Sequence, residues 1–283
     1  MRQRAFLRSP EKHHIMMWTR NHRLKTKGKA ESMRIKRTLP WILISVIGAF
    51  IISHAVAAPT ASDLLDRVKA AEAAVRDFKA EMVIIDANKK NVSGMGEGYA
   101  EILRLEKAIV QYKKPNLIRY DGYAEGIKAT YIQNGYVKLV LLPMVKQKVN
   151  VKDAPGKRQD ALDLGFLSSQ LWKDNNVSVI SSDNKGILKV KFDPKFGGDD
   201  KRRDIVWIDS RTLRVLKREK YRGNGELRIR IAYGDFEMLG GKLPIATKST
   251  MYDPKGGELG TVSYKNLKSN VGLPDSLFSL NQR

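Results

Sequence analysis

The chain has 283 residues, no cysteine, and 52 Lys and Arg against 30 Asp and Glu, which gives a formal net charge of +22. The absence of cysteine excludes disulfides, Cys–His nucleophiles and a lipid-modified N-terminal cysteine, so the protein is not itself a lipoprotein. All four histidines lie within the first 54 residues, which leaves the remainder without a Ser-His-Asp triad or the favoured ligands of zinc. We therefore expect a protein that is not an enzyme and that holds no metal or cofactor.

The N-terminus has two parts of different composition. Residues 1–32 are basic and show no hydrophobic period, so we interpret them as a mis-annotated extension before the true start at Met33; a basic nucleic-acid-binding arm is the alternative. Residues 33–57 have the order of a secretory signal peptide, with a basic start, an uncharged apolar run, and Ala55-Val56-Ala57 as the cleavage signal.

The apolar run fits a cleaved signal peptide better than a membrane anchor. From Leu39 to Ile52 it has 14 residues, whereas a helix that spans a bilayer needs about 20. Only an extension of the run to Ala58 would make it long enough for an anchor. The sequence thus predicts cleavage after Ala57 or Ala58, export to the periplasm, and one mature domain over residues 58–283.

The mature part is expected to begin with a helix and to continue in strands. Thr60 or Ser62 is a suitable N-cap, and apolar residues at three- and four-residue spacing predict an amphipathic helix through about Phe78. Alternation of apolar and polar residues then predicts strands over residues 78–84, 99–105, 131–134, 137–142 and 145–151, with a turn at Asn134-Gly135 between the third and the fourth.

A second helix and a second set of strands follow. The alternation stops in residues 158–172, where leucines at helical spacing predict a helix. Further strands are predicted over residues 187–194, on both sides of a turn at 209–212, and over residues 227–236, 243–252 and 259–264. The fold class is therefore mainly β with a few α. A large antiparallel sheet of about five or six strands on each side of the second helix must curl, and with two helices as its cover it can enclose an apolar cavity.

Basic residues occupy the polar positions of several predicted strands, namely Lys189, Lys191, Arg214, Lys217, Arg228 and Arg230. They form either the solvated outer face of the sheet or a contact with an anionic membrane surface, for which Arg228 and Arg230 are the candidates. Nucleic acid is not an expected partner, because the aromatic side chains fall on the apolar phase rather than beside these basic residues.

A set of large apolar residues is either ordinary core or the lining of a ligand cavity, and the sequence leaves both interpretations open. The candidates are Met82, Ile84, Leu103, Leu105, Leu139, Leu141, Met144, Phe166, Leu167, Leu171 and Trp207.

Three stretches, in this order, resemble the periplasmic outer-membrane lipoprotein carrier (LolA-like) family. "KKPNLIRYDG" (113–122) is similar to the family's basic-Arg-Pro-Asn-Leu-aromatic segment, and "NGYVKLVLLPMVKQKV" (134–149) to its Asp-Gly, apolar strand, Tyr-x-Pro and Gln pattern. "WIDSRTLRVLKREKYRGNGEL" with "NVGLPDSLFSL" (270–280) resembles its closing strands and its Asn-x-x-x-Pro-x-x-x-Phe ending. The resemblance covers essentially the whole mature chain and identifies it as similar to a divergent member.

The resemblance implies an unclosed β-barrel, covered by helices, that binds lipid or the acyl chains of lipoproteins in an apolar cavity and moves them toward the outer membrane. It places the family's functional Arg on Lys114 and the aromatic that follows it on Ile118; both are departures from the family pattern. Lys114 is thus the gating candidate, Arg104 competes with it as the equivalent position, and Ile118 joins the candidate cavity lining.

The expected partners are lipid or acyl chains, inner- and outer-membrane proteins, and an anionic membrane surface, and we expect a monomer. The alternative function is a LolA-like interaction or sensor module that binds a membrane-protein partner without catalysis.

Overall fold

The computed structural model describes residues 59–88, 103–196 and 202–282. The chain divides into two units, Met1–His54 and Ala55–Arg283, and every described residue belongs to the second unit. The predicted N-terminal extension and signal peptide, and most of the predicted strand at 99–105, lie outside the described residues. No helix within the described ranges is long and apolar enough to cross a membrane.

The first element is the amphipathic helix α1 (Ala61–Glu72), which confirms the predicted start near Thr60. Thr60 Oγ1 accepts a hydrogen bond from the Asp63 amide at 3.2 Å, and the Asp63 carboxylate accepts one from the Thr60 amide at 2.9 Å. This reciprocal capping box satisfies two backbone donors at the helix start. The prediction that the helix continues to about Phe78 was wrong, because the chain enters a strand at Asp77.

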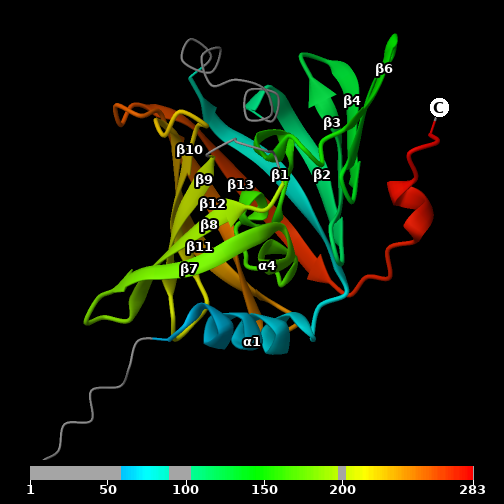
Figure 1. The fold of residues 1–283 in the computed structure, drawn as a ribbon. Helices are drawn as coiled ribbons and strands as arrows, with labels where there is room; N and C mark the ends of the chain where they lie inside the picture. Colours follow the sequence, from blue (N-terminus) through cyan, green and yellow to red (C-terminus); the bar gives the residue numbers. More distant parts are fainter. Residues whose placement is uncertain (1–58, 89–102, 197–201, 283) are drawn as a thin grey trace, which may run out of the picture. The chain divides into compact units, whose positions relative to one another are not determined.

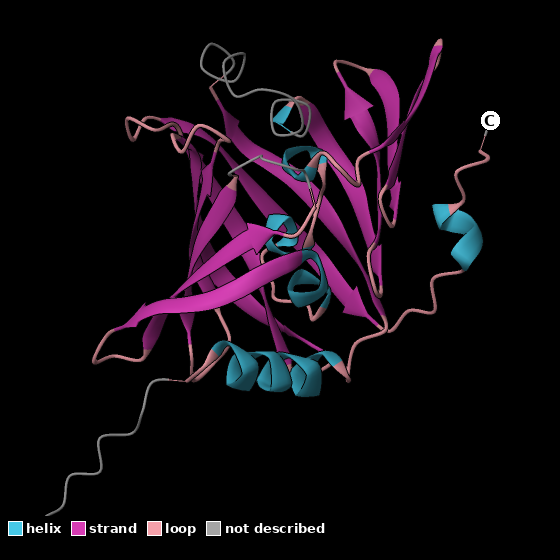
Figure 2. Ribbon diagram, viewed as in Figure 1, coloured by secondary structure: helices cyan, strands magenta, loops and turns pink. Residues whose placement is uncertain are grey.

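In the part of the chain that the structure describes, thirteen strands form one sheet. They are β1 (Asp77–Ala87), β2 (Leu105–Lys113), β3 (Leu117–Ala124), β4 (Ile127–Asn134), β5 (Val137–Leu142), β6 (Val145–Asn150), β7 (Asn175–Ser182), β8 (Ile187–Pro194), β9 (Arg203–Asp209), β10 (Val215–Tyr221), β11 (Leu227–Leu239), β12 (Leu243–Tyr252) and β13 (Glu258–Ser269). Their order in the sheet is β6-β5-β4-β3-β2-β1-β13-β12-β11-β10-β9-β8-β7, and all neighbours are antiparallel. The predicted fold class is confirmed: the sheet curls but does not close, because β6 and β7 form its two edges (Figures 1 and 2).

Most strand predictions are confirmed, but three strands were missed. The hairpins at Asn134-Gly135 and at residues 209–212 join β4 to β5 and β9 to β10 as expected. The strand predicted at 99–105 shares only Leu105 with β2, and the alternation predicted no strand at β3 or β7. In β3 an arginine and an aspartate lie among apolar residues, and β7 is an edge strand with mostly exposed side chains, so neither shows a strong period.

The mid-chain segment (residues 151–174) connects the two edge strands. It contains the short helices η1 (Pro155–Lys157), η2 (Ala161–Leu164) and α4 (Gln170–Asp174), and Figure 1 shows α4 within the curl of the sheet. The single helix predicted over 158–172 was wrong because Gly165 interrupts it with a φ of 77°. A Cβ at Gly165 would lie 2.8 Å from the Ala246 Cβ, so this position combines a left-handed turn with a close approach to β12.

The main core lies between the inner face of the sheet and the mid-chain segment. α1 contributes Leu64, Val68 and Ala71 to this core. Side-chain hydrogen bonds tie α1 to the mid-chain segment: Trp172 Nε1 donates to the Ala61 carbonyl at 3.1 Å, and Glu72 accepts from Ser168 Oγ at 2.7 Å. The helical cover is therefore one connected layer rather than two separate helices.

A second, smaller cluster lies on the opposite face of β3–β5. The C-terminal segment (residues 271–282) carries the 3-10 helix η3 (Asp275–Phe278) and packs Leu273 and Phe278 against Ile132 and Leu139. The segment is held at its start by Asp77, whose carboxylate accepts a hydrogen bond from the Val271 amide at 2.7 Å. The outer face of these strands is thus buried by the chain's own end, which lies outside the sheet in Figure 1.

Candidate functional site

An apolar cavity of about 340 Å³ lies against β2–β6. Its apolar lining consists of Leu105, Tyr120, Ala124, Ala129, Tyr131, Val140, Leu142 and Val145. The strand register aligns Tyr120 with Tyr131 and Tyr131 with Val140, so these three side chains form a row across β3, β4 and β5. The volume lies within the range of about 300–1,000 Å³ that is usual for small-molecule sites.

Polar groups sit at defined places around this apolar lining. They come from Arg104, Thr130, Lys138, Gln147 and Gln159. The Lys138 ammonium lies 5.1 Å from the centre of the Tyr131 ring, and the Tyr131 hydroxyl donates to Gln133 Oε1 at 3.1 Å. A mostly apolar cavity with a few fixed polar groups is the usual form of a binding site for an apolar ligand.

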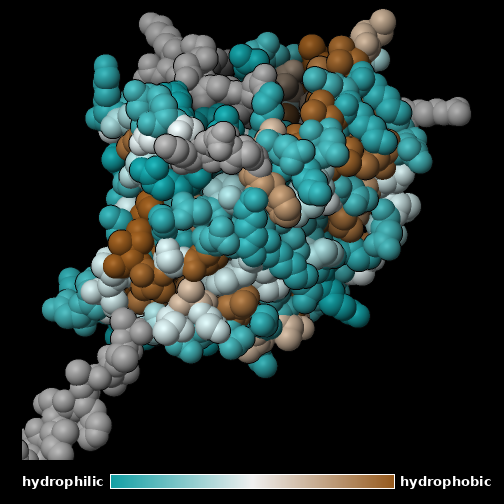
Figure 3. All heavy atoms as spheres, viewed as in Figure 1, coloured by the Kyte–Doolittle hydropathy of each residue, from teal (hydrophilic) through white to brown (hydrophobic). Residues whose placement is uncertain are grey.

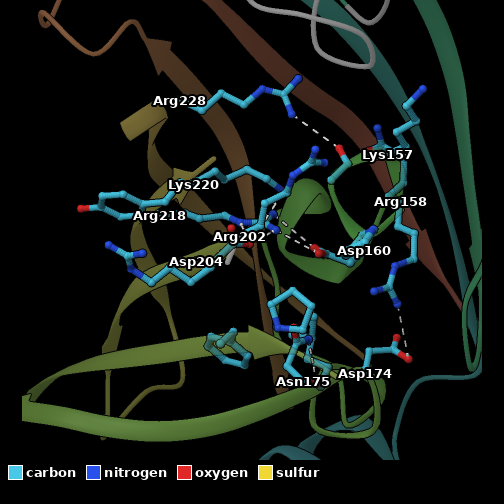
Figure 4. Close-up of a pocket in the computed structure, with 18 of the residues that line it drawn as sticks. Lys157, Arg158, Asp160, Asp174, Asn175, Arg202, Asp204, Arg218, Lys220 and Arg228 are labelled. Carbon is cyan, nitrogen blue, oxygen red and sulfur yellow. Dashed lines mark hydrogen bonds and ion pairs between the residues drawn. The ribbon is translucent and has the colours of Figure 1, made fainter. Parts of the chain in front are cut away.

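A second cavity of about 440 Å³ is strongly basic. Its basic lining residues are Lys157, Arg158, Arg202, Arg203, Arg218, Lys220, Arg222 and Arg228, and its acidic ones are Asp160, Asp174 and Asp204. Figure 4 shows that Lys157 and Arg158 enter from the mid-chain segment, whereas Arg218, Lys220 and Arg228 enter from the strands. We call this cavity the basic pocket.

Arg218 forms the floor of the basic pocket and is completely buried. Its guanidinium donates to Asp160 and Asp163 at 2.9 Å each and to Asp204 at 2.8 Å. Burial raises the pKa of the Asp160 carboxyl, and the positive charge of Arg218 opposes that shift. Lys220 completes the network, with its ammonium 3.7 Å from both Asp163 and Asp204. The floor is a structural ion cluster in which the carboxylates already serve as partners of cations.

Arg228 reaches the basic pocket through a local irregularity of the sheet. The β10–β11 register shifts between Lys220 and Tyr221, whose partners are Ile229 and Leu227, so Arg228 has no opposite residue. Such a bulge redirects the side chain of the extra residue. Arg228 Nη1 lies 3.5 Å from the Gly156 carbonyl oxygen.

Gly156 also lies against Arg202. A Cβ at this position would lie 1.7 Å from Arg202 Nη1, so only glycine lets the guanidinium lie in this place. Two arginines from different parts of the chain therefore meet at one residue of the mid-chain segment.

Gln159 lines both cavities. Its backbone is fixed by Gln133, which accepts from the Gln159 amide at 2.9 Å and donates to its carbonyl at 2.8 Å. The Gln159 residue is 6% exposed, and its side-chain Oε1 is buried with no hydrogen-bond partner among the described residues. An unsatisfied buried acceptor costs stability, and Gln159 places this one between the two cavities.

Exposed apolar residues gather near one end of β3–β6. Tyr123 and Ile127 flank the β3–β4 turn, and Leu142, Met144 and Val145 form the β5–β6 turn. Figure 3 shows apolar atoms at the surface over this part of the sheet. Since Leu142 and Val145 also line the apolar cavity, this surface is continuous with the cavity lining.

The structure distributes the sequence-predicted cavity residues over several places. Leu105 lines the apolar cavity and Leu171 lines the basic pocket. The main core contains Met82, Ile84, Leu103, Ile118, Phe166 and Leu167. Leu139 and Leu141 face the C-terminal segment instead of the cavity. Met144 is 94% exposed.

Trp207 lies between two lysine side chains. Lys189 and Lys217 place their ammonium groups 5.3 Å and 3.8 Å from the centre of its ring. Its neighbours in β9, Val206 and Ile208, are the residues that enter the main core. Trp207 is therefore on the outer face, where its ring is a cation–π platform.

The predicted basic candidates are also separated. Arg104 lines the apolar cavity. Lys114 donates from its ammonium to the Glu72 carbonyl at 2.8 Å, at the end of α1 where the helix dipole favours a positive charge. Arg228 lines the basic pocket, whereas Arg230 pairs with Glu219 at 3.2 Å.

Sequence reasoning missed most of the cavity lining. Tyr120 lies on the same face of β3 as the predicted Ile118, whereas Val140 lies on the face of β5 opposite to the predicted Leu139 and Leu141. No residue of β4, which carries Tyr131, was predicted to line the cavity. The signal that would have found them is the pair of tyrosines at opposed positions of two strands. The basic pocket was missed because its basic residues come from four separate stretches of sequence. Among the described residues, no three His, Cys, Asp or Glu side chains are grouped so as to hold a metal ion.

This open antiparallel sheet with a helical cover is similar in fold to solved structures that include a member of the LolA superfamily. A LolA superfamily protein from Nitrosomonas europaea matches with a TM-score of 0.55 and 17% sequence identity, over 78% of this chain and 98% of that one. A DUF1329 family protein from Desulfovibrio piger matches with a TM-score of 0.50 and 16% identity, over 77% of this chain and 96% of that one. These similarities confirm the predicted LolA-like fold.

Two further comparisons concern a solved structure and a family model. A lipoprotein-sorting protein domain from Vibrio parahaemolyticus matches with a TM-score of 0.47 and 16% identity, over 77% of this chain and 96% of that one. A family model that is described as "Uncharacterized protein" matches residues 163–282. No curated protein matches the chain in sequence.

Proposed function

We propose that this protein is a non-catalytic periplasmic carrier that binds the acyl chain of a lipid or lipoprotein and moves it toward the outer membrane. The observation that carries the proposal is the apolar cavity of about 340 Å³ against β2–β6. Each methylene group that such a cavity removes from water contributes about 0.8 kcal/mol to binding. The LolA-like fold is in keeping with this role.

The predicted signal peptide would direct the protein to the periplasm. Cleavage after Ala57 or Ala58 releases a domain that starts at Ala58, one residue before the described structure, or at Pro59, its first residue. In the periplasm the domain meets both membranes, which a carrier requires. Inner- and outer-membrane proteins act as donor and acceptor in this proposal.

Cargo release requires the cavity to open, and the helical cover is the element that moves. Lys114 is the proposed latch, because its ammonium joins the β2–β3 turn to the last turn of α1. The contact is a single hydrogen bond from a charged ammonium to a carbonyl, which contributes about 1.5–3 kcal/mol.

Native mass spectrometry of the protein purified from a bacterial periplasm without detergent tests the proposal. We expect adducts with the mass of a lipid or acylated peptide that are lost on solvent extraction. Val140→Asp, which places a charge in the cavity, should remove the adducts, and Lys248→Asp on an exposed position of β12 should keep them. A protein that is free of lipid and takes up none would overturn the carrier proposal. A membrane protein that co-purifies without lipid would favour the interaction or sensor module instead.

A further inference from the structure

Two hairpin turns lie next to each other at one end of the sheet (Figure 1). The pairing of β4 with β5 reaches Thr130 and Leu141, and beyond this pair β4 leads back to the β3–β4 turn while β5 leads on to the β5–β6 turn. The strand register therefore brings both turns to the same end. We call residues 123–128 and 142–148 the hairpin tips.

The hairpin tips expose several large apolar side chains. Tyr123, Ile127 and Val145 are at least half exposed, Leu142 is more than one-third exposed, and Met144 is 94% exposed. Figure 3 shows the apolar surface over this part of the sheet. Single apolar residues are common on protein surfaces, but a contiguous group of them marks a contact with another protein or with a membrane.

Lysines accompany these apolar side chains. The hairpin tips contain Lys128, Lys146 and Lys148 against one acidic residue, Glu125. All four are exposed. Lysine is depleted at protein–protein interfaces, whereas exposed apolar residues next to lysines are typical of segments that insert into the headgroup layer of an anionic membrane. The charge of the hairpin tips therefore favours a lipid bilayer over a protein partner.

The hairpin tips are continuous with the apolar cavity. Leu142 and Val145 are exposed and also line the cavity. Ala124, at the end of β3, and Arg104 line the cavity as well, and Ala124 pairs with Leu105 of β2. An acyl chain that moved between the cavity and a bilayer at this end would stay in apolar surroundings, which avoids the cost of exposing it to water.

We propose that the hairpin tips are a membrane-docking surface. Their apolar side chains enter the headgroup layer of an anionic bilayer, and their lysines contact the lipid headgroups. Docking by itself does not require the carrier function. The passage of an acyl chain between the cavity and the bilayer rests on the carrier function proposed above. This surface, rather than Arg228 and Arg230, is then the contact with an anionic membrane.

Vesicle flotation tests the docking. The protein is purified from a bacterial periplasm, and its mass must show that the apolar run in residues 33–57 is absent, because that run binds membranes by itself. We expect binding to vesicles of phosphatidylglycerol mixed with phosphatidylcholine, and at least about tenfold weaker binding to phosphatidylcholine alone. A protein that binds neither kind of vesicle would overturn the proposal.

Apolar variants identify the surface that binds. Ile127→Asp with Met144→Asp should weaken binding to the mixed vesicles at least about tenfold. Ile180→Asp with Met238→Asp makes the same change of charge at exposed apolar residues of β7 and β11 and should keep the affinity. Circular dichroism and thermal unfolding verify that each variant folds. If both pairs lose affinity equally, the effect is one of net charge and the proposal is wrong.

Lysine variants test the electrostatic part. Lys128→Gln with Lys148→Gln should weaken binding to the mixed vesicles more at about 50 mM than at about 500 mM salt. Lys242→Gln with Lys248→Gln removes the same charge from exposed positions of the β11–β12 turn and β12 and should have a smaller effect. Equal effects of the two pairs would contradict a contact at the hairpin tips.

A fluorescent reporter separates insertion from surface contact. The emission that Met144→Trp adds to the wild-type spectrum should shift to shorter wavelength on the mixed vesicles and be quenched by brominated lipids. Emission that stays as in water while the protein is bound would overturn insertion. A membrane protein that binds the hairpin tips while vesicles do not would make this surface a protein interface, and the proposal would be wrong.

Uptake of a soluble short-chain lipid separates docking from the carrier function. Ile127 and Met144 do not line the apolar cavity, so their Asp variants should take up this lipid as the wild type does. A wild type that takes up lipid but binds no vesicles would overturn the docking and leave the carrier function. A wild type that binds vesicles through the hairpin tips but takes up no lipid would support the docking and overturn the carrier function.

Discussion

Glu72 and Ser168, which are 96 residues apart in sequence, form a buried hydrogen bond of 2.7 Å between the end of α1 and the mid-chain segment. The second carboxylate oxygen of Glu72 accepts from the Ser169 amide at 3.1 Å. Glu72→Ala should lower the free energy of unfolding by about 1–3 kcal/mol, because it leaves a buried donor unsatisfied. Urea denaturation measures this loss. Asp66→Ala, on an exposed position of the same helix, should cost less than about 1 kcal/mol. Equal losses in the two variants would contradict the role of the contact.

The capping box of α1 gives the fold a dependence on pH. Hydrogen bonds from the Thr60 backbone and side chain hold the pKa of Asp63 below its ordinary value of 3.8. A lowered folded-state pKa means that the contribution to stability is present above pH 3.8 and is lost as the pH falls through the folded-state pKa. Asp63→Asn should therefore have a lower melting temperature than the wild type near neutral pH, and the difference should shrink in acid. Melting curves across this pH range test the prediction, and a constant difference would count against it.

Arg218 should be among the least replaceable side chains of the domain. Arg218→Met removes the only described guanidinium that contacts Asp160, Asp163 and Asp204 together, and it should cost about 3–5 kcal/mol of unfolding free energy. The deficit should decrease as the pH falls, because protonated carboxyls no longer need a counter-charge. Chemical denaturation at neutral and acidic pH measures both effects. Arg218→Lys keeps the charge and should lose less, so an equal loss in the two variants would show that packing, not charge, dominates.

Neighbouring residues of β5 should respond in opposite ways to substitution. Leu139 is fully buried against the C-terminal segment, so Leu139→Ala should cost about 2–5 kcal/mol of stability without changing the lipid affinity of the folded protein. Val140 faces the apolar cavity, so Val140→Asp should cost about 1 kcal/mol or less and weaken lipid binding at least about tenfold. Denaturation and lipid titration on both variants test the assignment of the two faces. If Leu139→Ala is the variant that loses binding, the cavity lies on the other face.

Strand β5 also shows which parts of the structure could be predicted from the sequence alone. The class of fold followed from the alternation of apolar residues, the hairpin turns and the order of motifs. The sequence did not predict which side chains of β5 face the cavity, because Val137 to Leu142 is apolar on both faces of the strand apart from Lys138. In the structure, one face of β5 lines the apolar cavity and the C-terminal segment covers the other face. A period-two pattern identifies a buried face only when the other face is polar.

Long-range contacts account for the rest of what the sequence did not reveal. Trp207 has the side chain of a core residue, yet it lies on the outer face because two lysines cover its ring. The basic pocket depends on a bulge at Arg228 and on the missing side chain of Gly156, and neither has a local signature that distinguishes it from an ordinary turn or strand. These sites are made by the meeting of segments far apart in sequence.

Because β6 and β7 form opposite edges of the sheet, the space that the curled sheet encloses is not fixed by backbone hydrogen bonds between them. In a closed barrel a continuous ladder of backbone hydrogen bonds sets the diameter. An increase in the diameter therefore requires that ladder to break. Here the two edges are joined by residues 151–174, and side-chain packing of that segment sets the spacing between them. The spacing between β6 and β7 can therefore increase to accommodate a larger ligand. Such a change exchanges side-chain contacts and leaves every strand pair intact.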